Sequence, residues 1–214
     1  MEEELKRPAA GAGTAGPRRL TAGKLTGQKP ALKMKEVWSI RTRLELEGDL
    51  RNLVLFNLAI DSKLRGYDLV RLKVGDVAAD GHVKSRGVII QKKTGRPVQL
   101  EITENTRRSI TALLESGMPG ADEYLFQSRL EASPHLSTRQ YARIVQGRVA
   151  SIGLNPATYG THSLRRTKAA LIYRKTGNLR AVQLLLGHAK LESTVRYLGV
   201  DVDDALEIST GIDL

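Results

Sequence analysis

The spacing of apolar residues changes twice along this 214-residue chain, and that change constrains its fold more than any other feature. From Met34 onward apolar residues recur at helical spacing, and Leu50 to Ile60 is almost wholly apolar, as expected of a buried central helix. Residues 98–102 then alternate between apolar and polar, which is the period of a strand. The helical period returns afterwards. This order predicts a single α+β domain.

The middle of the chain predicts a small antiparallel sheet. The β-branched run 88–90 and the alternating run 98–102 flank Lys93-Thr94-Gly95-Arg96, a turn sequence, so the two runs are expected to form a hairpin. A lone hairpin is marginally stable in water. An earlier strand within residues 76–83 is therefore expected to join it. The predicted fold is mostly helical, with a three-stranded antiparallel sheet.

Turn and capping residues mark helices on both sides of this sheet. Ser137 and Gln140 have the spacing of a capping box, and Gly177 and Gly187 each end a helical pattern. Several segments are expected to be helical: Gly66 to Lys73, His162 to Lys175, Leu191 to Leu198 and Asp203 to Ile208.

Residues 1–33 differ in composition from the rest. They are rich in Gly, Ala, Thr and Pro, show no apolar period, and carry seven Lys/Arg against three Glu. Such a segment is expected to be a disordered basic tail, ahead of a folded domain over residues 34–214. It is either a plain mobile terminus or a contact to DNA phosphates. The whole chain has 34 Lys+Arg against 23 Asp+Glu, and this net charge of +11 favours a polyanionic partner, nucleic acid first.

Several function classes are excluded by what the sequence lacks. Without cysteine it has no disulfide scaffold, thiolate metal site or Cys nucleophile. Neither a phosphate-binding loop nor an H-E-x-x-H motif occurs, and the acidic group at Asp201, Asp203 and Asp204 is typical of a helix start rather than a metal site. No run approaches the roughly 18 apolar residues of a membrane span. We expect a cytoplasmic protein that needs no metal, ATP or other cofactor.

Six residues with useful chemistry are spread along the chain. Taken singly, they are typical of helix-surface charges, a solvated turn residue, a helix-end histidine and a tyrosine at the edge of a core. They are Arg65, Lys93, His162, Arg165, His188 and Tyr197.

The order and local sequence of these residues resemble the tyrosine recombinase (phage integrase) family. Its signature is an Arg, a hairpin Lys, H-x-L-R, L-L-G-H and then a Tyr. The matching residues are Arg65, Lys93, His162-Ser163-Leu164-Arg165, Leu185-Leu186-Gly187-His188 and Tyr197, nine residues after His188. The resemblance runs from about Met34 to the C-terminus and implies a site-specific recombinase that cuts and rejoins double-stranded DNA.

The resemblance also implies how DNA is cut. Tyr197 would attack a phosphodiester and become a 3′-phosphotyrosine. Arg65 and Arg165 would clamp the non-bridging oxygens with paired hydrogen bonds, because guanidinium forks stay charged and fit phosphate geometry. His188 would donate a further hydrogen bond to a phosphate oxygen.

Proton movements complete the implied reaction. His162 would assist at the Tyr197 hydroxyl, since the pKa range of histidine suits that task. Lys93 would protonate the departing 5′ oxygen from the tip of the hairpin. Asp68, one turn beyond Arg65, would orient that arginine.

Two departures from the family pattern stand out. The chain reads Ser62-Lys63-Leu64-Arg65 where the family usually has Thr-Gly-Leu-Arg, and the N-terminal helical domain of most members does not precede residue 34. The resemblance implies a homotetramer on paired DNA sites and leaves room for an accessory DNA-bending protein. A type IB topoisomerase-like enzyme and a non-catalytic DNA-binding regulator are the alternatives.

Overall fold

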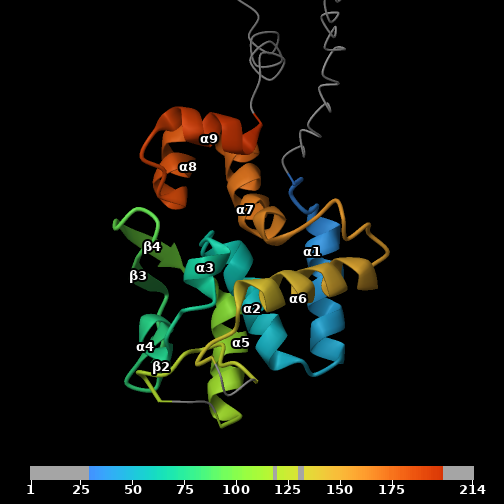
Figure 1. Ribbon diagram of the computed structural model, residues 1–214, viewed down its shortest axis with the longest axis vertical. Coiled ribbons are helices and arrows are strands. Elements are labelled where there is room, and N and C mark those ends of the chain that lie inside the picture. Colours follow the sequence, from blue (N-terminus) through green and yellow to red (C-terminus); the bar gives the residue numbers. More distant parts are fainter. Residues whose placement is uncertain (1–28, 118–119, 130–132, 200–214) are drawn as a thin grey trace, which may run out of the picture.

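The computed structural model describes residues 29–117, 120–129 and 133–199. Within these ranges the elements follow one another as α1 (Met34–Leu46), α2 (Leu50–Asp61), α3 (Gly66–Leu69), α4 (Val74–Val77), β1 (Ala78–Ala79), β2 (His82–Val83), β3 (Arg86–Ile90), β4 (Pro97–Glu101), α5 (Glu104–Glu115), α6 (Thr138–Ser151), α7 (Thr161–Thr176), α8 (Leu179–Leu186) and α9 (Leu191–Leu198). The mostly helical α+β fold predicted from the apolar spacing is confirmed (Figure 1). None of these helices is long and apolar enough to cross a membrane.

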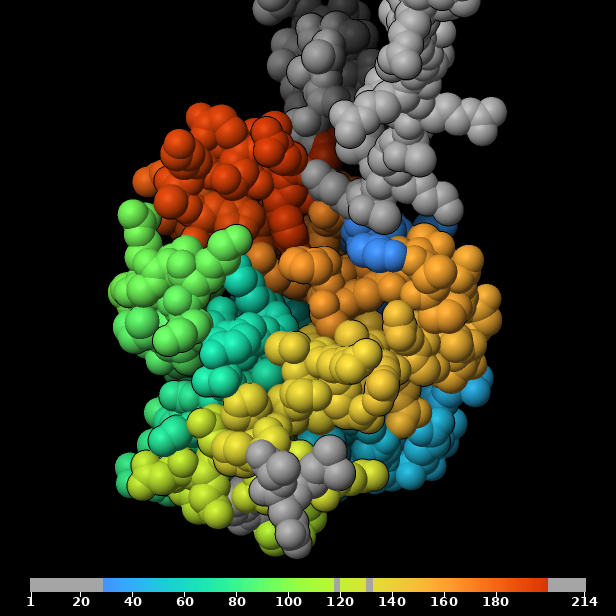
Figure 2. Space-filling view, viewed as in Figure 1, coloured from blue at the N-terminus to red at the C-terminus, as the bar shows by residue number. Residues whose placement is uncertain are grey.

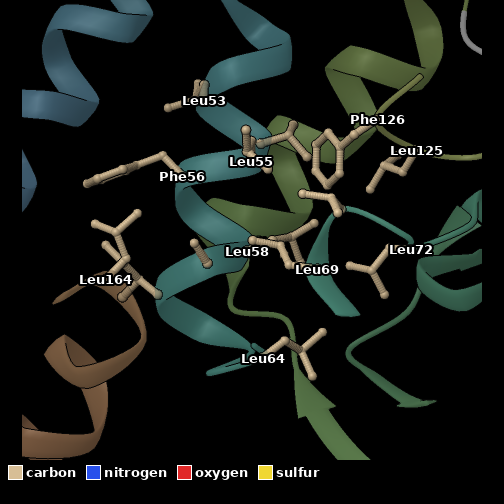
Figure 3. Packing of buried hydrophobic residues seen from close by; sticks show 14 of the residues in the cluster. Leu53, Leu55, Phe56, Leu58, Leu64, Leu69, Leu72, Leu125, Phe126 and Leu164 are labelled. Atoms are coloured by element: carbon tan, nitrogen blue, oxygen red, sulfur yellow. The ribbon is translucent and has the colours of Figure 1, made fainter. Parts of the chain in front are cut away.

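The apolar segment after residue 50 forms α2, which is the centre of the main core. Every residue from Leu53 to Asp61 is buried, so the helix is covered on all sides. The helices α1, α5 and α7 pack around it. Figure 3 shows α2 side chains meeting Leu125, Phe126 and Leu164 from distant parts of the chain. Because α2 is held on every side, the turn that follows it, which carries Arg65, has a fixed starting point.

The sheet differs from the prediction. In the part of the chain that the structure describes, it is not three-stranded: β3 pairs with β4 alone, with Arg86 opposite Glu101 and Ile90 opposite Pro97, and β1 pairs with β2 in a separate two-stranded sheet. The reason lies at Asp80-Gly81, where both residues have positive φ (50° and 77°). Two such residues make the tight turn that closes a hairpin on itself, so this segment pairs locally instead of joining the longer hairpin.

The segment before that local hairpin also contains a shorter helix than predicted. The expected helix from Gly66 to Lys73 ends at Leu69, and a second single turn, α4, begins at Val74. The Asp76 carboxylate closes this turn by accepting a hydrogen bond from the backbone N–H of Lys73 (2.8 Å). Residue 76 therefore belongs to a helical turn and not to a strand.

Two predicted segments fall wholly or mainly outside the described residues: the helix over 203–208, and the tail up to residue 28. The last residues assigned to the tail are described, and they are packed. Leu32 is buried, and its N–H donates to the Thr167 Oγ1 of α7 (3.0 Å). Ordered packing thus begins before the expected boundary at Met34.

The C-terminal helices have an apolar cluster of their own. Its buried members are Ala169 of α7 with Val182 and Leu186 of α8, and Tyr197 and Leu198 of α9 pack against them. Figure 1 shows α8 and α9 side by side at the end of α7, above the β3–β4 hairpin. The nucleophile predicted from the sequence is thus carried by a small unit beside the main core.

Candidate active site

The six residues singled out from the sequence line one cleft of about 670 Å³. It lies between the hairpin, the start of α7 and the α8–α9 unit. Figure 2 shows the surface of the C-terminal helices (red) directly above that of the hairpin (green). Among the described residues, seven cationic side chains line this cleft against one carboxylate, that of Glu192: Lys29, Arg65, Lys93, Arg165, Arg166, Lys190 and Arg196. A concave surface of this charge attracts a polyanion.

Arg65 is aimed by the hairpin. It is the residue before α3, is partly buried, and donates through Nη1 to the side-chain carbonyl of Gln91. Gln91 is fully buried at the end of β3, where it also accepts from the hydroxyl of Thr94 (3.2 Å). A movement of the hairpin tip would therefore change the position of the Arg65 side chain.

The role expected for Asp68 is not the one that the structure shows. Asp68 and Arg65 share no hydrogen bond among those of the described residues. The Asp68 carboxylate is buried, and its Oδ1 accepts from the backbone N–H of Lys92 (3.1 Å) instead. Because α3 is a single turn, Asp68 points toward the hairpin strand while Arg65 stands at the helix start. Asp68 thus fixes the base of the hairpin tip, and Gln91 takes the place expected for it.

Arg165 is nearly inaccessible to solvent and joins three parts of the site. Its Nε donates to the backbone carbonyl of Lys63 (2.5 Å), and its Nη2 donates to that of Leu186 at the end of α8 (2.8 Å). Its guanidinium carbon lies 5.3 Å from the centroid of the Tyr197 ring. The guanidinium is therefore fixed before any ligand arrives, which is what a preorganised phosphate ligand requires.

His188 is held as a neutral ring. Burial, with the positive charges of Arg165 and Arg65, lowers its pKa to about 4. Its Nδ1 lies 3.1 Å from the hydroxyl of Thr194, a fully buried residue. When that hydroxyl donates to Nδ1, the neutral ring carries its proton on Nε2, the nitrogen left for a phosphate oxygen.

Tyr197 lies on α9 with its phenol inside the cleft. Its hydroxyl donates a long hydrogen bond to the backbone carbonyl of His162 (3.4 Å), and its ring meets His188 edge to face at 5.4 Å. Burial raises the pKa of the phenol, while Arg165 and Arg166 oppose the rise. The phenol is thus protonated at neutral pH and faces groups that stabilise its anion.

The two proton-transfer candidates line the same cleft as this phenol. Partial burial lowers the pKa of the His162 imidazole, and Arg165, Arg166 and Arg65 lower it further, so the ring is neutral at neutral pH and able to accept a proton. Lys93 is exposed at the hairpin tip, where Gly95 has a φ of +64° and the backbone closes onto Gln91. From this tip Lys93 lines the cleft that holds Tyr197.

Two contributors to the site were missed by sequence reasoning. Gln91 could have been found, because the buried positions of β3 are Gly87 and Ile89 and the alternation places residue 91 on the same inner face. Arg166 directly follows the H-x-L-R box in the sequence. It is buried, with its guanidinium carbon 4.9 Å from the Tyr197 ring. Nothing in the helical spacing signalled this contact.

Known proteins with similar sequences include an integrase/recombinase and a tyrosine recombinase. Over 175 residues the chain is 29% identical to the probable integrase/recombinase YoeC of Bacillus subtilis (strain 168), covering 82% of this chain and 91% of that protein. It is 30% identical to the tyrosine recombinase XerD of Brucella suis biovar 1 (strain 1330), covering 71% of this chain and 48% of that one. The chain thus spans nearly all of the first relative and about half of the second.

Solved structures share the fold. XerA recombinase superposes with a TM-score of 0.68 at 21% identity, covering 85% of this chain and 64% of that one. XerH site-specific recombinase, in a post-cleavage complex with palindromic difH substrate, gives a TM-score of 0.65 at 22% identity, covering 86% and 53%. The sequence model of the phage integrase family matches residues 31–203. With this match over most of its length, the chain belongs to the phage integrase family.

Proposed function

We propose that this chain is a site-specific DNA recombinase that cuts and rejoins DNA strands through a covalent 3′-phosphotyrosine at Tyr197. The observation that carries the proposal is the convergence of this phenol with two arginines, two histidines and a hairpin lysine in one cationic cleft. A non-catalytic DNA-binding regulator would have no need of the phenol or of the neutral His162 beside it.

The proposed cleavage step balances in atoms and protons. The Tyr197 oxygen forms a bond to phosphorus while the bond from phosphorus to the 5′ oxygen breaks. His162 assists removal of the phenol proton, and Lys93 gives a proton to the departing 5′ oxygen. Arg65 and Arg165 receive the charge that builds on the non-bridging oxygens.

The second half of the reaction reverses the first. The phosphotyrosine keeps the energy of the phosphodiester, so a 5′ hydroxyl from another strand can attack it and release Tyr197. No external energy source is needed for that exchange. Exchange between two duplexes requires four such sites, so the working form in this proposal is a homotetramer on paired DNA sites within the bacterial cytoplasm.

The test is capture of the covalent intermediate. The protein is incubated with nicked duplexes that carry a randomised region, and adducts that survive denaturation are recovered and sequenced. We expect wild-type protein to yield adducts that share a sequence. Tyr197→Phe is expected to yield none while keeping the wild-type melting temperature, because it removes only one hydroxyl.

The same material separates the alternatives. Adducts formed by Tyr197→Phe would move the attack to another residue. Absence of adducts from the wild-type protein with every duplex, despite binding, would favour the regulator. Relaxation of supercoiled DNA without joining of two marked duplexes would favour a topoisomerase-like enzyme.

A further inference from the structure

A short segment ahead of α1 crosses the first half of α7. Leu32 is buried there, and its N–H donates to the hydroxyl of Thr167 (3.0 Å). Three residues earlier, the backbone carbonyl of Lys29 accepts from Nη1 of Arg166 (2.7 Å). We call residues 29–32 the strap. Two neighbouring residues of α7 thus hold it in place, one of them an arginine that lines the cleft.

The other end of that arginine meets the candidate nucleophile. Arg166 is 8% exposed, and its guanidinium carbon lies 4.9 Å from the centroid of the Tyr197 ring. The guanidinium carbon of Arg165 lies 5.3 Å from the centroid of the same ring, but two of the Arg165 N–H groups already donate to backbone carbonyls. Two guanidinium groups therefore lie near the ring, and His188 makes a T-shaped contact with it.

We propose that Arg166 is a positioning residue for Tyr197, and that the strap holds Arg166 in the orientation that this requires. The inference rests on the proposed role of Tyr197 as nucleophile. A guanidinium is a rigid fork with five donors, so one nitrogen can bind the Lys29 carbonyl while the remaining face lies against the phenol. The chain that enters the domain thereby sets the orientation of the nucleophile.

The arrangement also acts on the charge that develops in the reaction. As the phenol gives up its proton, negative charge grows on an oxygen in a partly desolvated site. The groups that face it are Arg165 and Arg166 from α7, His188 from the turn before α9, and the backbone of His162. Both arginines lower the pKa of the phenol against the effect of burial. Loss of Arg166 therefore removes a stabilising charge as well as a contact.

The first experiment needs no DNA. The phenol of Tyr197 is titrated by NMR in tyrosine-labelled protein, its signal being identified by its loss in Tyr197→Phe. Arg166→Gln is expected to raise the pKa of Tyr197 by about half a unit or more, since a neighbouring positive charge is lost. Leu32→Ala, which frees the strap without touching the cleft, is expected to shift it in the same direction.

Arg174→Gln is the matched control, because Arg174 is an exposed charge in the last turn of the same helix. It is expected to leave the titration of Tyr197 unchanged. An unchanged titration in Arg166→Gln would overturn the proposal. A shift in Arg166→Gln without one in Leu32→Ala would overturn the part assigned to the strap.

The second experiment measures single-turnover adduct formation on the nicked duplex selected above. We expect Arg166→Gln to slow this step by about tenfold or more, with the Kd for DNA changed by less than about threefold because many other cations contact phosphate. Arg166→Lys keeps the charge but not the fork and is expected to recover only part of the rate. It also serves as the folded variant if the glutamine substitution unfolds the domain.

The double variant Leu32→Ala/Arg166→Gln tests whether the two residues act through one route. It is expected to be no slower than Arg166→Gln alone, whereas independent effects would multiply. Multiplied effects would contradict the strap mechanism, and an undiminished rate in Arg166→Gln would contradict the whole proposal. If no duplex yields an adduct with wild-type protein, the proposed function fails, and the titration still decides the role of Arg166.

Discussion

At the scale of single residues, two arginines with the same implied task are embedded very differently. Arg65 is partly buried, and its one hydrogen bond among the described residues goes to Gln91. Arg165 is buried and satisfies the carbonyls of Lys63 and Leu186, which would otherwise be left without a donor. Arg165 is therefore part of the architecture as well as of the cleft.

This difference predicts different outcomes for the two alanine variants. Arg165→Ala is expected to lower the free energy of unfolding by about 2 kcal/mol or more, since each buried unpaired group costs about 1–3 kcal/mol. Arg65→Ala should change it by less than about 1 kcal/mol while still abolishing adduct formation. Urea unfolding of both variants checks this. Equal destabilisation would mean that Arg65 also carries structure.

Lys63 is a buried amine in a backbone conformation that favours glycine. It is 1% exposed, has a φ of +55°, and its Nζ donates to the backbone carbonyl of Asp61 (2.6 Å). Burial, with Lys168 adding to it, lowers its pKa from 10.5 to about 8, against the opposing charges of Glu101 and Asp61. The glycine usual in the family at this position avoids both the strain and the buried charge.

The lowered pKa of Lys63 fixes the direction of a pH effect. Below pH 8 both folded and unfolded chains carry the proton, so the burial cost is fully present. Between pH 8 and 10.5 the folded chain releases it first, and stability rises with pH by about 3 kcal/mol. In Lys63→Gly that rise should be absent from the unfolding free energy. The control Lys35→Ala, at an exposed lysine, should keep the wild-type slope.

The site residues show how far sequence could reach. The order of Arg65, Lys93, the H-x-L-R and L-L-G-H boxes and Tyr197 was enough to predict which side chains share the cleft. It could not show that Gln91 rather than Asp68 contacts Arg65. Which residue contacts Arg65 depends on how the four-residue helix α3 is oriented against the hairpin. That orientation is set by tertiary packing and leaves no periodic pattern in the sequence.

At the scale of elements, the predictions succeeded where an apolar pattern covered a whole element and failed where the elements were only a few residues long. The buried helix α2, with its long apolar run, and the β3–β4 hairpin, with two apolar runs around a turn sequence, are confirmed. The prediction of a third strand was wrong because residues 74–83 form a one-turn helix and a short hairpin with two residues in each strand. Such short pieces are decided by single contacts, here the cap by Asp76 and the turn at Asp80-Gly81.

The end of α8 is a close contact between elements that a substitution can probe. Gly187 ends the helix with a φ of +63°, and a Cβ there would lie 2.6 Å from Cγ2 of Val98 and 3.1 Å from the Gln91 side chain. Gly177 ends α7 with a φ of +62°, but a Cβ there would meet nothing within 4 Å. The two glycines share a backbone conformation and differ only in their surroundings.

Alanine at the two glycines should therefore separate strain from contact. Gly177→Ala is expected to cost about 1–2 kcal/mol of unfolding free energy, the penalty for a left-handed non-glycine residue. Gly187→Ala should cost measurably more and slow adduct formation, because α8 must move away from Val98 of β4 and from the Gln91 side chain. Chemical denaturation and adduct kinetics check both. Equal losses of unfolding free energy in the two variants would show that the hairpin moves aside for the added methyl group at no measurable cost.

At the scale of the whole molecule, the proposed recombinase must bring four copies together. The residues after Gly199 lie outside those described, and their sequence, with Leu206 and Ile208 among acidic residues, is that of a short amphipathic segment. A segment this short is marginal alone and needs a surface to dock on. The segment is expected to dock either on its own domain or, as the family resemblance implies, on the next protomer, where it would close a ring of heterologous contacts.

Deletion of residues 200–214 tests this assembly. The truncated chain is expected to keep adduct formation on a single site, since it retains all the described residues that line the cleft. Joining of two marked duplexes is expected to be lost. Recombination at the wild-type rate by the truncated chain would show that assembly depends on another surface.

The separate apolar cluster of α8 and α9 gives the C-terminal helices a lower local stability than the main core. Of the described residues it buries Ala169, Val182 and Leu186 alone, whereas the main cluster draws on elements from α1 to α7. Units held by few buried apolar side chains open at a lower free energy than the rest of the fold. Backbone amides of α9 should thus exchange their hydrogens with solvent through sub-global openings that leave α2 closed. In the proposed reaction, such openings would let Tyr197 leave and re-enter the cleft while the main core stays folded.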